Sequence, residues 1–382
     1  MRGCGFIIVL VWSAATLAAE EKKPTVAERL YKADWSGAEQ ELRRRVADDP
    51  RDGDARLQLG FVQTLRTFER FAAFQWEYGA RFDRAALLMP RGVFPGENPT
   101  PNRLSYRAWR RNLETVLRDL EAAERTLAEV PETATFRVSL RKLQWDPDGD
   151  GKPSPLIPRE LPESVTLENP DLEIAFDATD GIWLRGYCHL LSGTLNVVLA
   201  VDGQAIFDSF APEVYKNPIV AEADSPKWVQ TGFVEPERLS IARRHWIRTA
   251  ELSEAMWKSA ERETDNDREW IPNPRQTSAV LPLKVTAEMI TAWSAAMNES
   301  RALLEGRKLS PRWRFLGRRP EPLPGVSMKR LLDDPPPGPI ISWILEAPEK
   351  YLEDGPLTDE AVFQRLQPIF GENLLWFGMW VN

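Results

Sequence analysis

The chain has 382 residues, of which 43% are hydrophobic and 28% are charged, and it carries a formal net charge of −8. These proportions are those of a globular protein and exclude extensive disorder, and the length is enough for one large domain or two of ordinary size. Since an acidic surface without a basic stripe repels phosphate backbones, we expect no nucleic-acid partner.

The N-terminus has the three parts of a secretory signal peptide, which we assign to residues 1–18. Arg2 gives the positive start, residues 5–17 are apolar, and Thr16 and Ala18 are the small residues before a cleavage site. An uncleaved anchor is the alternative, but the apolar segment is shorter than the ~20 residues that a span requires. We therefore expect an exported, soluble protein, in the periplasm or outside the cell, that does not span the membrane after cleavage.

Residues 24–145 are predicted to form a repeat-like helical region. Its small residues and turn formers have the spacing found in tetratricopeptide repeats, where small side chains let two antiparallel helices approach closely. The resemblance covers about one and a half repeats, whereas a stable solenoid needs about three. We therefore expect a helical hairpin and not a peptide-binding array. The residues that carry the resemblance are Ala38, Leu42, Pro50, Leu59, Gly60, Ala72 and Gly79.

Within this region, residues 61–82 are apolar on two sides, and residues 103–130 have the most regular helical periodicity. Prolines then exclude a helix from the following segment, 146–176, which contains an aspartate-rich loop and an extended connector. Residues 177–382 are predicted to be a helical C-terminal region, compatible with packing against 24–145 as one domain.

The C-terminal helices are expected at 181–201, 236–262, 286–305 and 358–369. Thr286 and Thr358 are the predicted N-caps, and Gly306 is the predicted C-terminal cap. Short strands are expected at 136–140 and 172–176. The predicted fold class is mainly α: helical hairpins or a bundle, a proline-rich connector and little β structure.

Cys188 is the one cysteine that follows the signal segment, so the mature chain has no internal disulfide. It lies in the apolar segment 186–201, which also contains His189 and Asn196 and is predicted to be a buried helix and not a membrane span. We interpret Cys188 as an inert core residue, with a reactive thiol as the alternative.

The segment WDPDGDGKPS, residues 145–154, matches the first half of an EF-hand calcium loop. Alternation turns every second side chain inward, and three carboxylates this close repel one another unless a cation or water separates them. We therefore predict one structural calcium ion, with a bare acidic turn as the alternative. The side chains of Asp146, Asp148 and Asp150 and the backbone carbonyl of Lys152 would be the ligands. Gly151 is the glycine of the sharp turn.

The second half of this loop departs from the EF-hand pattern. The position of the bidentate glutamate is occupied by Ile157, inside a proline run that cannot form the exiting helix. The ligand that completes the site must then come from elsewhere in the chain. Its candidates are Glu160, Asp177, Asp180 and the acidic cluster of Asp265, Asp267 and Glu269.

The two histidines, His189 and His245, each lie in a helical pattern and are interpreted as core residues. The neighbouring Cys188 and His189 point in different directions on a helix, so they do not readily bind one metal. Arg185 and His189, by contrast, share one helix face. With Asp180 and other carboxylates they define an alternative hypothesis, a hydrolase that uses convergent carboxylates.

Three segments, taken in order, resemble an uncharacterised family of exported bacterial proteins: DPDGDGK (146–152), FDATDGIWLRGYCHLL (176–191) and LLEGRKLSPRWRF (303–315). The resemblance spans most of the mature chain. It implies that the aspartate loop is a family feature, and it carries over no catalytic residue.

The sequence therefore favours an exported, non-catalytic, calcium-binding helical protein that interacts with another envelope protein or a peptide. The alternative is a cell-envelope hydrolase. A deep pocket lined by Arg185, His189 and two or more carboxylates would favour the enzyme, whereas a filled interior would favour the interaction protein.

Overall fold

The computed structural model describes residues 24–81, 96–156, 170–220, 231–279, 284–311, 324–340, 349–374 and 377–378. The predicted signal peptide, Ile157 and Glu160 lie outside these residues. Within the described ranges, the helices are too short or too polar to cross a membrane.

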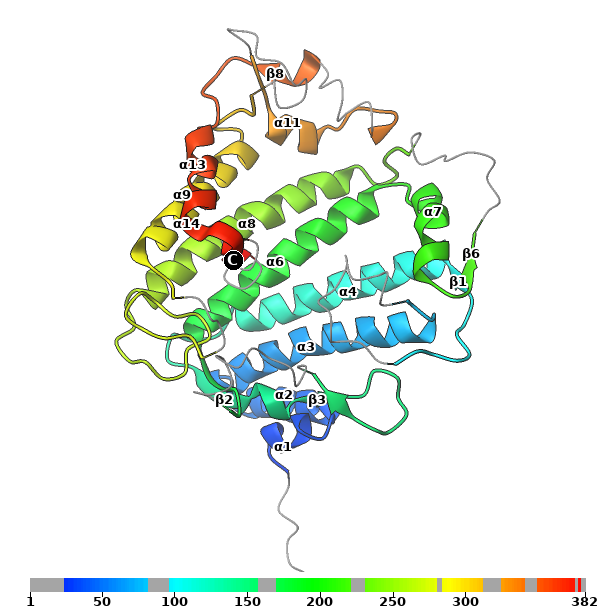
Figure 1. Cartoon of the computed structure of the whole chain (residues 1–382), viewed down its shortest axis with the longest axis vertical. Coiled ribbons are helices and arrows are strands. Elements are labelled where there is room, and N and C mark those ends of the chain that lie inside the picture. The colour runs from blue at the N-terminus through cyan, green and yellow to red at the C-terminus, as the bar shows by residue number, and fades with distance from the viewer. Residues whose placement is uncertain are drawn as a thin grey trace, which may run out of the picture.

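Long helices lie side by side in the order of the chain and form the body of the molecule (Figure 1). After the short α1 (Val26–Leu30), each of these helices packs against the next. They are α2 (Trp35–Asp48), α3 (Gly53–Glu77), α4 (Tyr106–Leu127), α6 (Ala178–Ala200), α8 (Glu237–Ala260) and α9 (Ala287–Leu304). The mainly α fold class is confirmed.

Short helices cover the ends of this layer (Figure 1). Two of them were not expected from the sequence: α7 (Gln204–Val214), which contains Pro212, and α11 (Met328–Asp333), which lies in a proline-rich stretch. The expected helix 358–369 is wrong as a single element. It is divided into α13 (Glu360–Gln364) and α14 (Leu366–Phe370), because Pro368 has no N–H to bond the carbonyl of Gln364.

Helix termini follow local capping chemistry. Thr286 caps α9 as predicted, since its side chain accepts a hydrogen bond from the Met289 N–H. Gly306 follows the end of α9 with a φ of 76°, the left-handed conformation predicted for a C-terminal cap. The prediction for Thr358 is wrong, because Asp359 accepts the capping hydrogen bond from the Ala361 N–H.

Strands are short and occur in pairs. The two predicted strands are confirmed within one residue, as β2 (Thr135–Ser139) and β5 (Glu173–Asp177), and they pair with each other in antiparallel register. The other pairs are β1 (Leu104–Ser105) with β6 (Pro218–Ile219), β3 (Gln144–Trp145) with β4 (Ser154–Pro155), and β7 (Gly325–Val326) with β8 (Leu352–Glu353).

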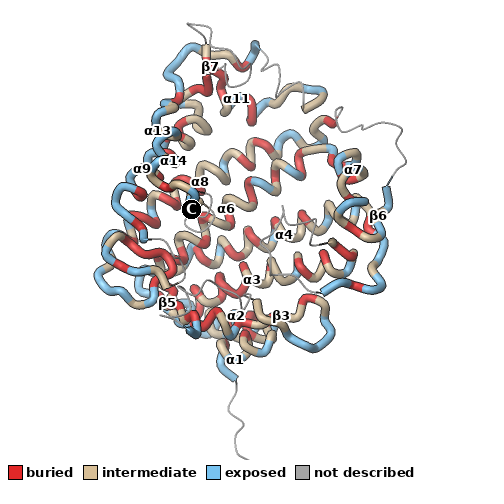
Figure 2. Tube along the Cα trace, in the orientation of Figure 1, coloured by how far each residue is buried: buried red, intermediate tan, exposed pale blue. Residues whose placement is uncertain are grey.

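The largest hydrophobic core contains buried side chains from both predicted helical regions. The Phe61 ring on α3 lies 5.3 Å from that of Phe136 on β2 and 5.0 Å from that of Phe176 on β5. Buried positions recur along the helices, and exposed ones gather in the loops at their ends (Figure 2). The β2–β5 pair therefore joins the N-terminal helices to α6 through a shared core.

The packing of α6 against α8 is the helix contact that bears on the sites below. A Cβ atom at Gly193 would lie 2.5 Å from Nε1 of Trp246, so a side chain at this position and the indole ring cannot both keep their places. The two helices make the most extensive contact between elements in the fold. Glycine at 193 thus sets how closely α6 and α8 pack.

Gly193→Ala should lower the free energy of unfolding by about 1–3 kcal/mol, the usual cost of overpacking. The cost of overpacking should exceed the ~1 kcal/mol by which alanine stabilises a helix interior relative to glycine. Gly181→Ala in the same helix is the control, since its Cβ would lie 3.1 Å from the end of the Leu57 side chain. Urea denaturation should show a loss for the first variant and little change for the second; equal stability of both would contradict this account.

Candidate functional site

The aspartate loop is the connection between β3 and β4. Trp145, the last residue of β3, is buried in the core and pairs with Ser154 at the start of β4. The indole N–H of Trp35 on α2 donates a 2.6 Å hydrogen bond to the Gln144 carbonyl. Both ends of the loop are thereby fixed to the helical body, while the loop itself reaches the surface.

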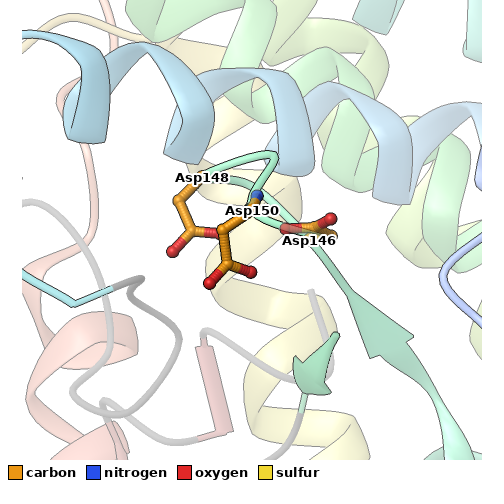
Figure 3. A group of neighbouring side chains, drawn as sticks. All are labelled: Asp146, Asp148 and Asp150. Carbon is orange, nitrogen blue, oxygen red and sulfur yellow. Dashed lines mark hydrogen bonds between the residues drawn. The ribbon is translucent and has the colours of Figure 1, made fainter. Parts of the chain in front are cut away.

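The structure brings together the three predicted metal-ligating aspartates. Each of Asp146, Asp148 and Asp150 offers a carboxylate oxygen within 4.8 Å of the others (Figure 3). Asp146 and Asp148 are half-buried and Asp150 is exposed. The separation between these oxygens is small enough for one cation to contact all three.

Backbone geometry turns the aspartates toward one another. Gly149 and Gly151 adopt φ values of 67° and 76°, which favour glycine over any other residue. The Gly151 N–H donates to Oδ2 of Asp146 over 3.0 Å, and the Lys152 N–H donates to Oδ1 of Asp150 over 2.7 Å. These bonds close the turn and leave other carboxylate oxygens available to a ligand.

The charges of the loop are incompletely balanced. Oδ1 of Asp146 is buried and has no hydrogen-bond partner among the described residues. Burial raises the pKa of Asp148, and the hydrogen bond that protonated Asp148 donates to Asp146, together with the nearby charges of Asp150 and Asp146, raises it further. Lys152, predicted to contribute its carbonyl, is seen to place its ammonium 3.3 Å from Asp150 Oδ2.

Glu69 on α3 borders this loop and was not foreseen from the sequence. Its carboxylate accepts a hydrogen bond from the Asp146 backbone N–H, which lowers its pKa, but the larger effect of burial raises that pKa overall. Glu69 therefore holds the start of the loop against α3 and adds to the negative charge beside it. The two residues are far apart in the chain, so no local pattern could have indicated the contact.

Three other acids considered for this site, Asp177, Asp180 and Glu269, belong to a separate cluster where β5 enters α6. Asp177 caps α6, accepting hydrogen bonds from the Thr179 and Asp180 N–H groups, and its own N–H donates to Asp180 over 3.1 Å. Among the described residues, these acids and those of 265–269 do not belong to the group that can share one cation with the loop. None of these positions is therefore supported as the ligand that would complete the calcium site.

This second cluster, formed by Asp177, Asp180, Glu263 and Glu269, retains protons to unusually high pH. Burial, followed by the charges of neighbouring acids, raises the pKa of Glu269 to about 7. Burial is also the main cause that raises the pKa of Glu263 to about 7, although Thr179 donates a hydrogen bond to it over 2.5 Å. Burial raises the pKa of Asp180 as well.

The two histidines, interpreted from the sequence as core residues, are half-buried and meet between α6 and α8. Nδ1 of His189 lies 2.8 Å from Nδ1 of His245. On the other side of its ring, Nε2 of His189 lies 3.4 Å from Oε1 of Glu124 on α4. Arg185 donates to the same oxygen from Nε and Nη2, each over 3.1 Å. The predicted partner Asp180 takes no part and bonds to Asp177 instead.

A pocket of about 200 Å³ opens beside this histidine pair. A hydrogen bond from His189 and the positive charge of Arg185 hold the pKa of Glu124 down to about 2, against the effect of burial. Burial, then the neighbouring charge of His189, lowers the pKa of His245 to about 4. The pocket is lined by Glu121, Glu124, Arg125, Cys188, His189, Ser192 and His245.

Cys188 faces the pocket from α6 but is unsuited to reaction. It is fully buried, its sulfur lies 3.9 Å from Oγ1 of Thr64, and burial raises the pKa of its thiol to about 12. This environment agrees with the predicted inert core residue.

Comparisons with protein-family models, curated proteins and solved structures give no match for this chain. The roles of the aspartate loop and of the histidine pocket are therefore argued from their own geometry and chemistry.

The acid cluster should make stability depend on pH. Because the folded-state pKa of Glu269 lies above its ordinary value of 4.5, its contribution is fully present below about pH 4.5 and is lost as pH rises through about 7. Glu269→Gln removes this ionisation, so the variant should match the wild type at pH 4 and melt at a higher temperature at pH 8. Thermal denaturation at both pH values measures the difference.

Glu132→Gln, at an exposed turn, is the matched control for this experiment. It should leave the melting temperature unchanged at both pH values. A Glu269→Gln variant that is destabilised at pH 8 would mean that the carboxylate makes a favourable ionic contact there, contrary to our expectation.

Proposed function

We propose that the protein is a helical calcium-binding protein that acts by interaction and not by catalysis, with one structural ion held by Asp146, Asp148 and Asp150. The observation that supports it best is the convergence of the three carboxylates within 4.8 Å, including one buried oxygen that lacks a partner in the described residues. The signal-like N-terminus supports export to a compartment outside the cytoplasm.

Like charge at this separation gives a physical reason for a cation. Two unit charges ~4 Å apart interact by about 1 kcal/mol in bulk water and about 4 kcal/mol near a protein surface. The Lys152 ammonium contacts Asp150, but this side chain is 85% exposed and its charge is therefore heavily screened. A divalent ion at the centre of the loop would replace this repulsion with attraction.

Ligand chemistry favours calcium over magnesium. Calcium accepts six to eight oxygen ligands in flexible geometry, whereas magnesium demands a near-ideal octahedron. A loop with three carboxylates would leave the remaining positions to backbone carbonyls, including that of Lys152, and to water. With so few protein ligands, we expect a dissociation constant on the order of 10⁻⁴–10⁻³ M, the range of extracellular calcium modules.

The ion would fix the β3–β4 connection against α3. Glu69 already contacts the Asp146 backbone from that helix, so an ordered loop would hold the start of the proline-rich connector in one position. For a partner, exposed apolar side chains offer a surface at the end of the helical layer near α7. They include Ile206 on α7, Ile219 on β6 and Val234, whose N–H bonds to the end of α6.

Calcium should raise the melting temperature, because a ligand that binds only the folded state adds about 2.7 kcal/mol at a hundredfold excess over its dissociation constant. Magnesium should add less. Asp148→Ala should abolish the calcium-dependent increment without changing the helical circular dichroism, and Asp354→Ala, at an exposed position outside the loop, should preserve it. Absence of binding by calorimetry at millimolar calcium, or an increment that survives Asp148→Ala, would leave the loop as an acidic turn.

The histidine pocket is the specific observation that favours the second candidate, an envelope hydrolase. The pocket is lined by His189 and by two carboxylates, Glu121 and Glu124, while Arg185 reaches it through Glu124. Asp180, part of the original hypothesis, belongs to the other acid cluster. The enzyme hypothesis therefore moves to the space between α4, α6 and α8.

A further inference from the structure

The histidine pair lies in the most extensive helix contact of the described residues, between α6 and α8. His189 lies one turn before Gly193 on α6, and His245 directly precedes Trp246 on α8. Because Trp246 occupies the space that a side chain at Gly193 would need, the two helices approach closely enough for the imidazoles to touch. The ring centroids are 5.0 Å apart and the planes are inclined by 48°.

The tautomer of His189 determines what its Nδ1 offers to His245. Nε2 of His189 lies 3.4 Å from Oε1 of Glu124, and in the neutral tautomer with its proton on Nε2, Nδ1 presents a lone pair to His245. The 2.8 Å separation between the two Nδ1 atoms is that of an N–H···N hydrogen bond. One proton therefore lies between two nitrogens that are both good metal ligands.

The surroundings of His189 match those of a metal-binding histidine. Such histidines donate their second N–H to a carboxylate, which fixes the orientation of the ring and increases its basicity. Glu124 fills this role, and Arg185 holds Glu124 through two donors to Oε1. Packing between α4 and α6 alone would not require a carboxylate held in this orientation behind the imidazole.

We propose that the pocket binds one divalent transition-metal ion of the zinc class between Nδ1 of His189 and Nδ1 of His245. With zinc–nitrogen bonds of about 2.0–2.1 Å at a tetrahedral angle, the two nitrogens would lie roughly 3.4 Å apart. The observed separation requires an opening of about half an ångström, which rotation of the rings supplies. Binding releases the shared proton to solvent.

The pocket supplies the remaining coordination positions. Its volume of about 200 Å³ has room for water, which occupies about 30 Å³ per molecule in the liquid. Glu121 lines the pocket one helical turn before Glu124, and water would fill the coordination positions that the two histidines leave open. This site is independent of the proposed calcium loop, because calcium prefers oxygen ligands and takes imidazole poorly.

Calorimetric titration of the tag-free full chain with zinc, in saturating calcium, tests the proposal. We expect one zinc ion per chain. His189→Ala and His245→Ala should each lower the affinity at least a hundredfold, and Glu124→Gln should lower it about 10- to 100-fold through the orientation of His189. Asp148→Ala is the control and should leave zinc affinity unchanged, since it removes only the calcium loop.

A second measurement on the wild-type chain needs no variant. The chain has two histidines, so the imidazole ¹⁵N spectrum contains two ring systems, and saturating zinc should shift Nδ1 of both. The proposal is overturned if neither ring system responds to zinc. It is equally overturned if His245→Ala, shown to be folded by circular dichroism, binds zinc as the wild type does; the pair would then be a structural hydrogen bond.

Discussion

The packing of α6 against its neighbours is the constraint on which the rest of the structure depends. This helix contacts α3, α4 and α8, and it continues directly from β5. Small residues along it, among them Gly181, Gly186 and Gly193, are buried, and they allow close approach where larger side chains would separate the helices. The acid cluster at the start of α6 and the histidine pair near its middle both take their geometry from this one helix.

The fold contains two groups of like charges, and the environment of each determines how repulsion is relieved. In the cluster around Asp180 and Glu269, burial raises the pKa values, to about 7 for Glu269, so these carboxyl groups hold their protons to a higher pH than free acids do and repel one another less. The aspartate loop is more exposed: the pKa of Asp150 is lowered, first by the Lys152 backbone N–H, so its carboxylate stays ionised. Repulsion there is relieved most directly by a cation, which is why the exposed group and not the buried one suits a metal ion.

Local patterns predicted what local forces determine. Periodicity identified the long helices, alternation identified β2 and β5, and the spacing of Asp146, Asp148 and Asp150 predicted their convergence, because each depends on residues within a few positions of one another. Other contacts connect separate elements, and no local sequence pattern indicates them. They are the contact of Glu69 with the loop and that of Glu124 with His189. The errors have a local origin: Asp359 and not the adjacent Thr358 caps α13, and Pro368 divides a helix whose apolar pattern is continuous.

The chemistry of the histidine pocket links the enzyme hypothesis to metal binding. An acid–base hydrolase needs two groups whose pKa values are pushed apart around neutrality. Glu124 does not provide the acid, since its pKa of about 2 keeps it ionised and committed to Arg185 and His189. A zinc-class ion held by the two histidines would supply a nucleophile without a second carboxylate, because such an ion lowers the pKa of a bound water to about 7. Metal binding would therefore strengthen the enzyme hypothesis, whereas the interaction hypothesis does not depend on it.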